Sequence, residues 1–217
     1  GAAFEVSGTA AFVGRGSAIA VPIPPVRRGS GRAGNCRRRV SGGAGRRVAI
    51  LGLGGLGHLA VKIAAAFGAE VTVLGRSLDK KADALEFGAV DYKLTTDVIE
   101  SQKNYFDIIL NTTSADLDID GLLGTLRVGG ALVNVGLPGA RQDFDPFAII
   151  ASEKVIAGSN TGGISLTQEM LDFCATNGIG SAVEIVDASN PAAVDAAYDR
   201  VVGADVRYRF VIDASTI

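Results

Sequence analysis

The sequence predicts an α/β fold, a doubly wound parallel sheet with helices on both faces. Short apolar runs alternate with segments of helical periodicity from Arg46 onward. A glycine-rich motif follows the first apolar run and opens the first helical segment. The 217 residues are 47% hydrophobic and 20% charged, which is enough apolar content for a buried core.

The apolar runs are short, partly β-branched, and typical of strands buried on both faces of a parallel sheet. Strands are expected at 48–51, 71–74, 106–110, 131–135, 154–157 and 208–213.

Helices are expected between these strands. The first follows the glycine motif, and the second begins near Ser77, whose hydroxyl can cap it, and ends before Gly88. Ser165 and Gln168 have the spacing of a capping box at the start of a later helix. Pro191 suits the first turn of the last helix.

Composition excludes several classes of function. The formal net charge is −2, which does not suggest a dedicated nucleic-acid binder. No apolar run approaches the roughly 20 residues that cross a bilayer, so no membrane partner is expected. Two cysteines and one histidine nearly exclude a metal site built from several such ligands. They also favour a reducing compartment, so we expect a cytoplasmic protein. Cys174 shares a helical face with Met170, so we expect it to be part of the core.

The first 45 residues differ from the remainder. Residues 1–69 contain nine Arg, one Lys and one acidic residue, and the segment from Arg27 to Gly45 has little periodic apolar content. We interpret residues 1–45 as a basic leader, with a poorly ordered arm at Arg27 to Gly45. A transit peptide, a nucleic-acid arm and a non-native leader remain alternatives.

The most informative motif comprises Gly52, Leu53, Gly54, Gly55, Leu56 and Gly57. It has the GxGxxG pattern between a strand and a helix, as in dinucleotide-binding folds of the Rossmann type. Gly52 allows a tight turn, Gly54 lets a pyrophosphate approach the backbone, and Gly57 lets the helix pack closely on the strand. The helix start supplies amides and a positive dipole end to the phosphates. A glycine-rich turn without a ligand is the structural alternative.

The residues after the second strand favour NADP(H) over NAD(H). An NAD site places an acidic residue about 20 residues beyond the first glycine, to bind the ribose hydroxyl. Here that place holds Arg76 and Ser77, with Lys80 one turn along. A planar guanidinium suits a phosphate better than a neutral diol. Ordinary solvated charges are the alternative interpretation of Arg76 and Lys80.

Several ordered segments resemble the medium-chain zinc alcohol dehydrogenases, in the branch similar to cinnamyl alcohol dehydrogenases. The resemblance covers residues 42–217 and rests on 52–62, 77–81, 111–115, 135–138, 158–163, 170–174 and 205–213. It implies oxidation of primary alcohols and reduction of aldehydes, with hydride moving to or from the nicotinamide of NADP(H). The expected partner is therefore a small alcohol or aldehyde substrate.

The resemblance also assigns roles along the chain. It implies that Ser77 and Lys80 hold the adenosine 2′-phosphate, although Gly75 and Arg76 depart from the small hydroxyl residues more common there. Arg207 falls near a position that meets the pyrophosphate in relatives. Other residues implied in the cofactor site, several of them around the nicotinamide, are Asn111, Thr112, Val135, Gly136, Leu137, Ser159, Asn160 and Thr161.

Two places in these segments, Asn111 to Thr113 and His58, have more than one interpretation. Asn111 to Thr113 also matches a glycosylation sequon, but no secretory signal supports that reading. His58 follows the glycine motif without an identifiable acidic or nucleophilic neighbour, so we expect a positional residue rather than an acid or base. No catalytic residue is assigned.

The resemblance implies a catalytic domain and zinc ligands that are not found in residues 1–45. In relatives zinc acts as a Lewis acid on the carbonyl. We therefore expect a truncated copy: a leader at 1–45, a dinucleotide-binding domain at 46–181, and a C-terminal segment at 182–217 that belongs to the otherwise missing domain and exposes apolar residues. In relatives the strand near 154–160 pairs with its twin, so the resemblance makes a homodimer a candidate assembly.

Two other functions remain open. The first is a non-catalytic NADP(H)-binding module. The second is a methyltransferase-type site, which also uses a glycine-rich loop but does not account for the later matching segments.

Overall fold

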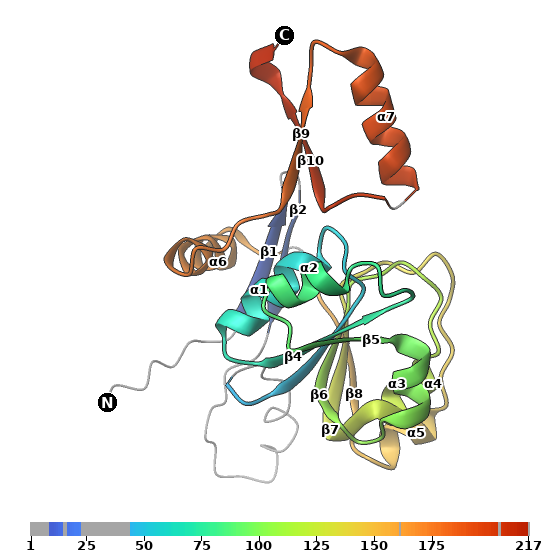
Figure 1. Cartoon of the computed structure of the whole chain (residues 1–217). Helices are drawn as coiled ribbons and strands as arrows, with labels where there is room; N and C mark the ends of the chain where they lie inside the picture. Colours follow the sequence, from blue (N-terminus) through green and yellow to red (C-terminus); the bar gives the residue numbers. More distant parts are fainter. Residues whose placement is uncertain (1–8, 15–16, 23–43, 161, 204, 217) are drawn as a thin grey trace.

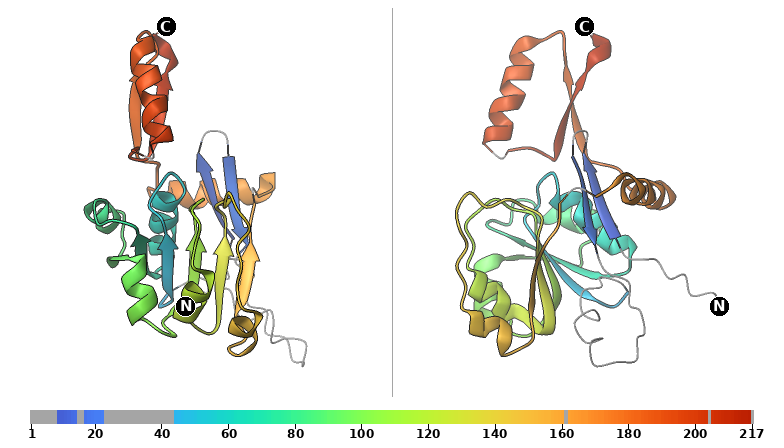
Figure 2. Two further views of the ribbon diagram at one scale, coloured as in Figure 1. Left: turned by 90° about the vertical axis from the view of Figure 1, so that its right-hand side faces the viewer. Right: turned by 180° about the vertical axis from the view of Figure 1, so that it is seen from behind.

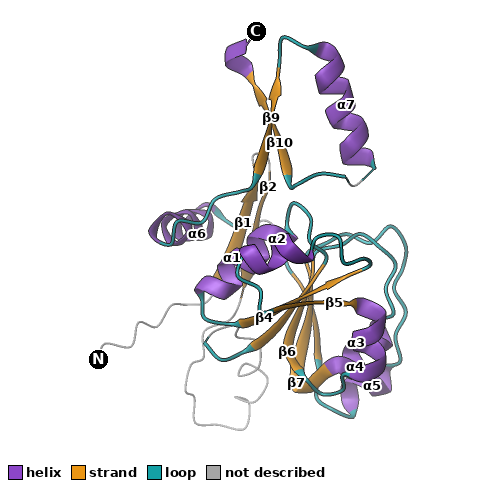
Figure 3. Cartoon of the chain, in the orientation of Figure 1, coloured by secondary structure: helices purple, strands orange, loops and turns teal. Residues whose placement is uncertain are grey.

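The computed structural model describes residues 9–14, 17–22, 44–160, 162–203 and 205–216. Its centre is a six-stranded parallel sheet in the order β5-β4-β3-β6-β7-β8 (Figures 1 and 3). The strands are β3 (Arg47–Leu51), β4 (Glu70–Gly75), β5 (Asp91–Leu94), β6 (Phe106–Asn111), β7 (Leu126–Asn134) and β8 (Val155–Gly158). The predicted doubly wound parallel sheet is thus confirmed.

The strand order reverses direction between β3 and β6. From β3 the chain adds β4 and β5 on one side, then returns to add β6, β7 and β8 on the other. At such a switch point the loops after the two central strands diverge, which leaves a crevice at their carboxyl ends. The glycine motif directly follows β3, so the fold places it at this point.

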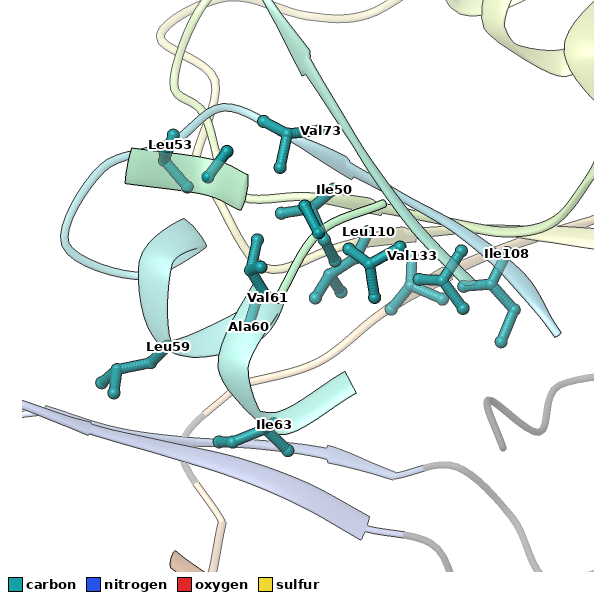
Figure 4. Packing of buried hydrophobic residues seen from close by; sticks show 14 of the residues in the cluster. Ile50, Leu53, Leu59, Ala60, Val61, Ile63, Val73, Ile108, Leu110 and Val133 are labelled. Carbon is teal, nitrogen blue, oxygen red and sulfur yellow. The ribbon is translucent and has the colours of Figure 1, made fainter. Parts of the chain in front are cut away.

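Helices cover both faces of the sheet. They are α1 (Gly57–Ala66), α2 (Lys81–Glu86), α3 (Thr95–Ser101), α4 (Ile119–Thr125), α5 (Pro146–Ile150) and α6 (Ile164–Thr176). Figure 4 shows one core, in which Val61 and Ile63 of α1 pack with Ile50 and Leu110 of the central strands. A second core, around Leu132, buries α3 and α4 against the opposite face.

The chain ends in a separate layer, which we call the C-terminal unit. It comprises β9 (Val183–Asp187), α7 (Pro191–Val202), β10 (Arg209–Asp213) and the 3₁₀ helix η3 (Ala214–Thr216), with β9 and β10 paired in parallel. The unit projects beyond the carboxyl ends of the central strands (Figure 2). As expected, it exposes large apolar side chains, namely Val183, Ile185, Tyr198, Val201, Val202 and Ile212.

The N-terminal region contains a hairpin that the sequence analysis did not predict. Strands β1 (Thr9–Gly14) and β2 (Ser17–Pro22) pair in antiparallel register. The hairpin lies alongside α6 (Figure 1). Most of the expected basic arm falls within 23–43, outside the described residues.

Two predicted helix caps are wrong. Helix α2 begins at Lys81 without a side-chain cap, and the Ser77 hydroxyl instead donates to Asp79 at 2.8 Å. Helix α6 begins at Ile164 with Gly163 as its N-cap, so Ser165 lies inside the helix. A short polar side chain next to a helix start can bond locally instead, as the Ser77 hydroxyl does with Asp79.

The other details of the helices agree with the sequence. Pro191 occupies the first turn of α7, where Asn190 caps the helix by accepting from the Ala193 amide. Cys174 is buried against Met170, as expected for a core residue. Among the described residues no helix has the length and apolar character of a membrane span.

Candidate functional site

Each glycine of the motif meets a different steric demand. Gly52 has a φ of +89°, and its amide donates to the Leu74 carbonyl at 2.8 Å, which makes the tight turn after β3. A Cβ at Gly57 would collide with the Gly52 carbonyl oxygen, so only glycine lets α1 start this close to the strand. Around Gly54 a Cβ would find nothing within 4 Å. The backbone at Gly54 is thus open to an approaching group.

The start of α1 has no acidic side chain in its first turn to offset the positive end of the helix dipole. Its N-cap is Leu56, which provides no side-chain hydrogen bond. The ten-residue helix therefore directs its positive dipole end at the glycine loop without a local carboxylate.

The turn after β6 is joined to the glycine loop. The Thr112 hydroxyl lies 2.9 Å from the Leu51 carbonyl oxygen and 3.1 Å from that of Gly52. The Asn111 side chain is fully buried, donates to Asn134 at 3.0 Å and accepts from the Thr113 amide at 3.0 Å. Asn111 thus shapes this turn from inside the protein, and its burial removes it from reach as a glycosylation site in the folded chain.

The predicted nicotinamide segments follow β7 and β8. The amides of Val135 and Gly136 both donate to the Asn111 carbonyl, each at 3.0 Å, which brings this turn beside the turn after β6. The Leu137 side chain is 84% exposed. The Ser159 amide donates to the Asn134 carbonyl at 3.0 Å, and Asn160 is exposed. Thr161 lies outside the described residues.

The predicted 2′-phosphate residues separate into two groups. Arg76 and Ser77 are exposed just beyond the end of β4. Lys80 instead turns toward the glycine loop, with its amine 3.3 Å from the Leu53 carbonyl oxygen. Burial lowers the pKa of the Lys80 amine, and the nearby Arg207 lowers it further. Gly75, the last residue of β4, leaves space that the Tyr92 hydroxyl fills.

Arg209, which was not singled out from the sequence, lies against the glycine loop. Its guanidinium carbon would be 2.7 Å from a Cβ on Gly55, so the planar group rests on the glycine loop. Its Nε atom is buried and has no hydrogen-bond partner among the described residues. Arg207 pairs with Asp83 on α2 instead. Arg209 is the first residue of β10 and Arg207 precedes the strand, and no local pattern in the sequence distinguishes the two arginines.

A cavity of about 870 Å³ opens between the glycine loop and the C-terminal unit. Gly54, Gly55, Lys80 and Arg209 provide its polar side, while apolar residues of α7 and β10 provide much of the remainder. The fold thus brings two cations and the open glycine backbone to one hollow, which suits a ligand that carries negative charge.

His58 lies beneath this loop and is fully buried. Its Nδ1 atom lies 3.1 Å from the Gly54 carbonyl oxygen, and its Nε2 atom accepts from the Ala182 amide at 3.2 Å. Burial is the main cause that lowers the pKa of His58 to about 4, so the ring is neutral at pH 7. These contacts agree with the expected positional role.

Comparison with known protein families now decides the family. Residues 55–176 match the profile of the family described as zinc-binding dehydrogenase. The chain belongs to the zinc-binding dehydrogenase family. The matched segment runs from the glycine loop to the end of α6.

Curated relatives of this zinc-binding dehydrogenase chain are bacterial and plant enzymes. The probable formaldehyde dehydrogenase AdhA of Bacillus subtilis is 51% identical over 177 residues, which are 81% of this chain and 50% of that protein. The NADP-dependent alcohol dehydrogenase C 1 of Mycolicibacterium smegmatis is 47% identical over 182 residues, or 83% of this chain and 51% of that protein. The chain thus spans about half the length of these relatives.

Solved structures give the same result. A cinnamyl alcohol dehydrogenase from Sorghum bicolor superposes with a TM-score of 0.75 at 37% identity, covering 80% of this chain and 49% of that one. The Helicobacter pylori CAD complexed with NADP(H) gives 0.71 at 33% identity, with coverage of 80% and 49%.

The family name raises the question of zinc. Within residues 9–14, 17–22, 44–160, 162–203 and 205–216, no three His, Cys, Asp or Glu side chains are grouped so that they could hold a metal ion. The described part of this zinc-binding dehydrogenase chain therefore does not fit a zinc centre.

Proposed function

We propose that the chain is the NADP(H)-binding part of an alcohol dehydrogenase that moves hydride between a nicotinamide and a primary alcohol or aldehyde. One observation carries the proposal: the open backbone at Gly54 faces a cavity that also holds the Arg209 guanidinium, whose Nε has no hydrogen-bond partner among the described residues. Open glycine backbone, a helix start and a guanidinium cation fit a pyrophosphate.

The choice of cofactor has independent support. No acidic residue stands at the end of β4, where Arg76 and Ser77 are exposed. A guanidinium and a hydroxyl suit the adenosine 2′-phosphate, whereas an acidic residue would select the free ribose hydroxyl. The Mycolicibacterium relative is named NADP-dependent, and the Helicobacter structure is a complex with NADP(H).

Different segments of the chain would bind different parts of NADP(H) along the crevice. The loop from Gly54 to Gly57 would hold the pyrophosphate with Arg209, and Arg76 and Ser77 the 2′-phosphate. The turns at 135–137 and 159–160 would border the nicotinamide. When bound, NADP(H) supplies or accepts the hydride, while this chain orients the ring and keeps water from one side of it.

Paired glycine substitutions test the binding site. Gly54→Ala has room to fold, because its Cβ would meet nothing within 4 Å, but the new methyl group would stand where a phosphate approaches. Gly139→Ala is the matched control, since its Cβ also meets nothing within 4 Å. We expect wild type and Gly139→Ala to enhance NADPH fluorescence and bind it more tightly than NADH, and Gly54→Ala to lose about tenfold or more in affinity. The proposal fails if the wild type binds neither nucleotide, or prefers NADH.

A turnover assay separates hydride transfer from binding alone. The wild-type chain is incubated with NADPH and cinnamaldehyde or benzaldehyde, with and without added zinc, and NADPH oxidation is followed by absorbance. We expect binding with weak or undetectable oxidation, because the described residues do not fit a zinc centre. Binding without oxidation would mean that this chain acts by itself as a non-catalytic NADP(H)-binding module, and robust zinc-dependent oxidation would overturn that expectation.

A further inference from the structure

His58 connects three separate parts of the chain. Its ring lies at the start of α1, contacts Gly54 in the glycine loop, and accepts from Ala182 just before β9. The ring also stacks on Tyr208, with centroids 4.9 Å apart and planes inclined by 18°. The glycine loop, the entry to β9 and the entry to β10 thus meet at one buried side chain.

The two hydrogen bonds determine the tautomer. A backbone amide can only donate, so Nε2 must present its lone pair to Ala182. The proton of the neutral ring therefore resides on Nδ1 and is donated to the Gly54 carbonyl oxygen. A single neutral tautomer satisfies both partners, and either a proton gain or the other tautomer would break the bond to Ala182.

A neighbouring side chain strengthens the same connection. Lys62, one helical turn after His58, donates from its amine to the Gly180 carbonyl at 2.8 Å. Two successive turns of α1 therefore hold the segment that leads into the C-terminal unit. Tyr208 is followed directly by Arg209, whose guanidinium rests on Gly55.

We propose that His58 is a positioning residue that ties the C-terminal unit to the glycine loop and thereby holds Arg209 over the pyrophosphate site. This inference rests on the proposed NADP(H)-binding function. Arg209 needs such a support, because its buried Nε atom has no hydrogen-bond partner among the described residues. His58 supplies the support from below the loop, where it does not face the cavity.

Two substitutions at His58 separate its two hydrogen bonds. The amide of His58→Asn can occupy the place of Nδ1 and donate to Gly54, but it is too short to reach Ala182. The amide oxygen of His58→Gln can occupy the place of Nε2 and accept from Ala182. We expect His58→Asn to raise the Kd for NADPH about three- to tenfold, as for the loss of one hydrogen bond, and His58→Gln to restore most of the affinity.

A double-mutant cycle with Arg209→Met distinguishes positioning from general destabilisation. If His58 acts through Arg209, then His58→Asn should change the Kd less than about twofold once Arg209 is absent. Cys174→Ala is the control, because it removes a buried side chain of α6 and should lower the melting temperature without changing the Kd in either background.

Each outcome has one meaning. Equal loss of affinity from His58→Asn in both backgrounds, or no loss in the wild-type background, would overturn the positioning role. If His58→Asn does not fold, the cycle is run with His58→Ser, whose hydroxyl can donate to the Gly54 carbonyl one turn back but cannot reach Ala182, and the same two results would overturn the role. Absence of NADPH binding by the wild type would contradict the proposed function instead.

Discussion

The Nη1 atom of Arg207 lies 3.0 and 2.8 Å from the two carboxylate oxygens of Asp83, across 124 residues of chain. Asp83 also accepts from the Tyr208 hydroxyl at 2.5 Å. This carboxylate already neutralises Arg207, whereas the Arg209 guanidinium rests on the glycine loop. The two arginines therefore have different contacts, although they are two residues apart in the sequence.

The two arginines should differ in their effect on cofactor affinity. We expect Arg209→Met to raise the Kd for NADPH about tenfold or more, because a charge-assisted contact to a phosphate is lost. Arg207→Met should change the Kd for NADPH less than about twofold. Arg207 is already paired with Asp83, and this half-exposed ion pair contributes little free energy to the fold. Fluorescence titration measures both constants. A larger effect at Arg207 would return the pyrophosphate role to that residue.

Selectivity for the phosphorylated cofactor should depend on Arg76. Arg76→Ala removes an exposed guanidinium at the end of β4, so we expect the Kd for NADPH to rise about tenfold while that for NADH stays within about twofold. The ratio of the two constants is the measurement. Equal weakening of both nucleotides would mean that Arg76 does not bind the 2′-phosphate.

Stability should fall in mild acid because His58 is buried and neutral. Its pKa is lowered to about 4 in the folded chain, from 6.5. Between these values the unfolded chain binds a proton that the folded chain does not, so the free energy of unfolding decreases as pH falls below 6.5. We expect a loss of about 2 kcal/mol between pH 7 and pH 5 from this residue.

Urea unfolding at the two pH values measures that loss. His58→Gln is the comparison, because His58 is the one histidine of the chain and glutamine does not titrate. A pH dependence that persists unchanged in His58→Gln would assign the effect to other groups.

A buried carboxylate should stabilise the amino-terminal end of the central strands, where Asp107 lies near the start of β6. Burial alone raises the pKa of Asp107, but hydrogen bonds from the Arg47 amide and the Arg46 guanidinium outweigh it, with Arg127 also close, so the pKa is lower than usual. The stability it provides is present above its ordinary value of 3.8 and is lost as pH falls through the lower folded value.

Substitution tests this network directly. Asp107→Asn should lower the free energy of unfolding by about 2 kcal/mol, because it leaves cationic partners without their carboxylate. Asp205→Asn is the control, since that side chain is 79% exposed and its ion pair with Arg200 should contribute under about 1 kcal/mol. Equal effects of the two substitutions in urea unfolding would contradict the role of Asp107.

The central strands could be predicted because a continuous apolar run in the sequence corresponds to burial on both faces of the sheet. Val48 to Leu51 is apolar throughout, and in the structure both faces of β3 are covered. Strands β5 and β9 and helices α3 to α5 were missed, since their short segments carry little periodic signal. The cap at Ser77 was wrong because its hydroxyl found a local carboxylate.

The sequence by itself determined the local backbone of the glycine loop. A strand, a motif with glycine at 52, 54 and 57, and a following helix specify that turn, because steric limits at those positions act over a few residues. Only the tertiary structure decided which cation reaches the loop and what His58 contacts. Arg209, Tyr208 and Ala182 are more than 120 residues from the loop, so their placement depends on how the C-terminal unit docks on α1 and α2, and no local pattern encodes that docking.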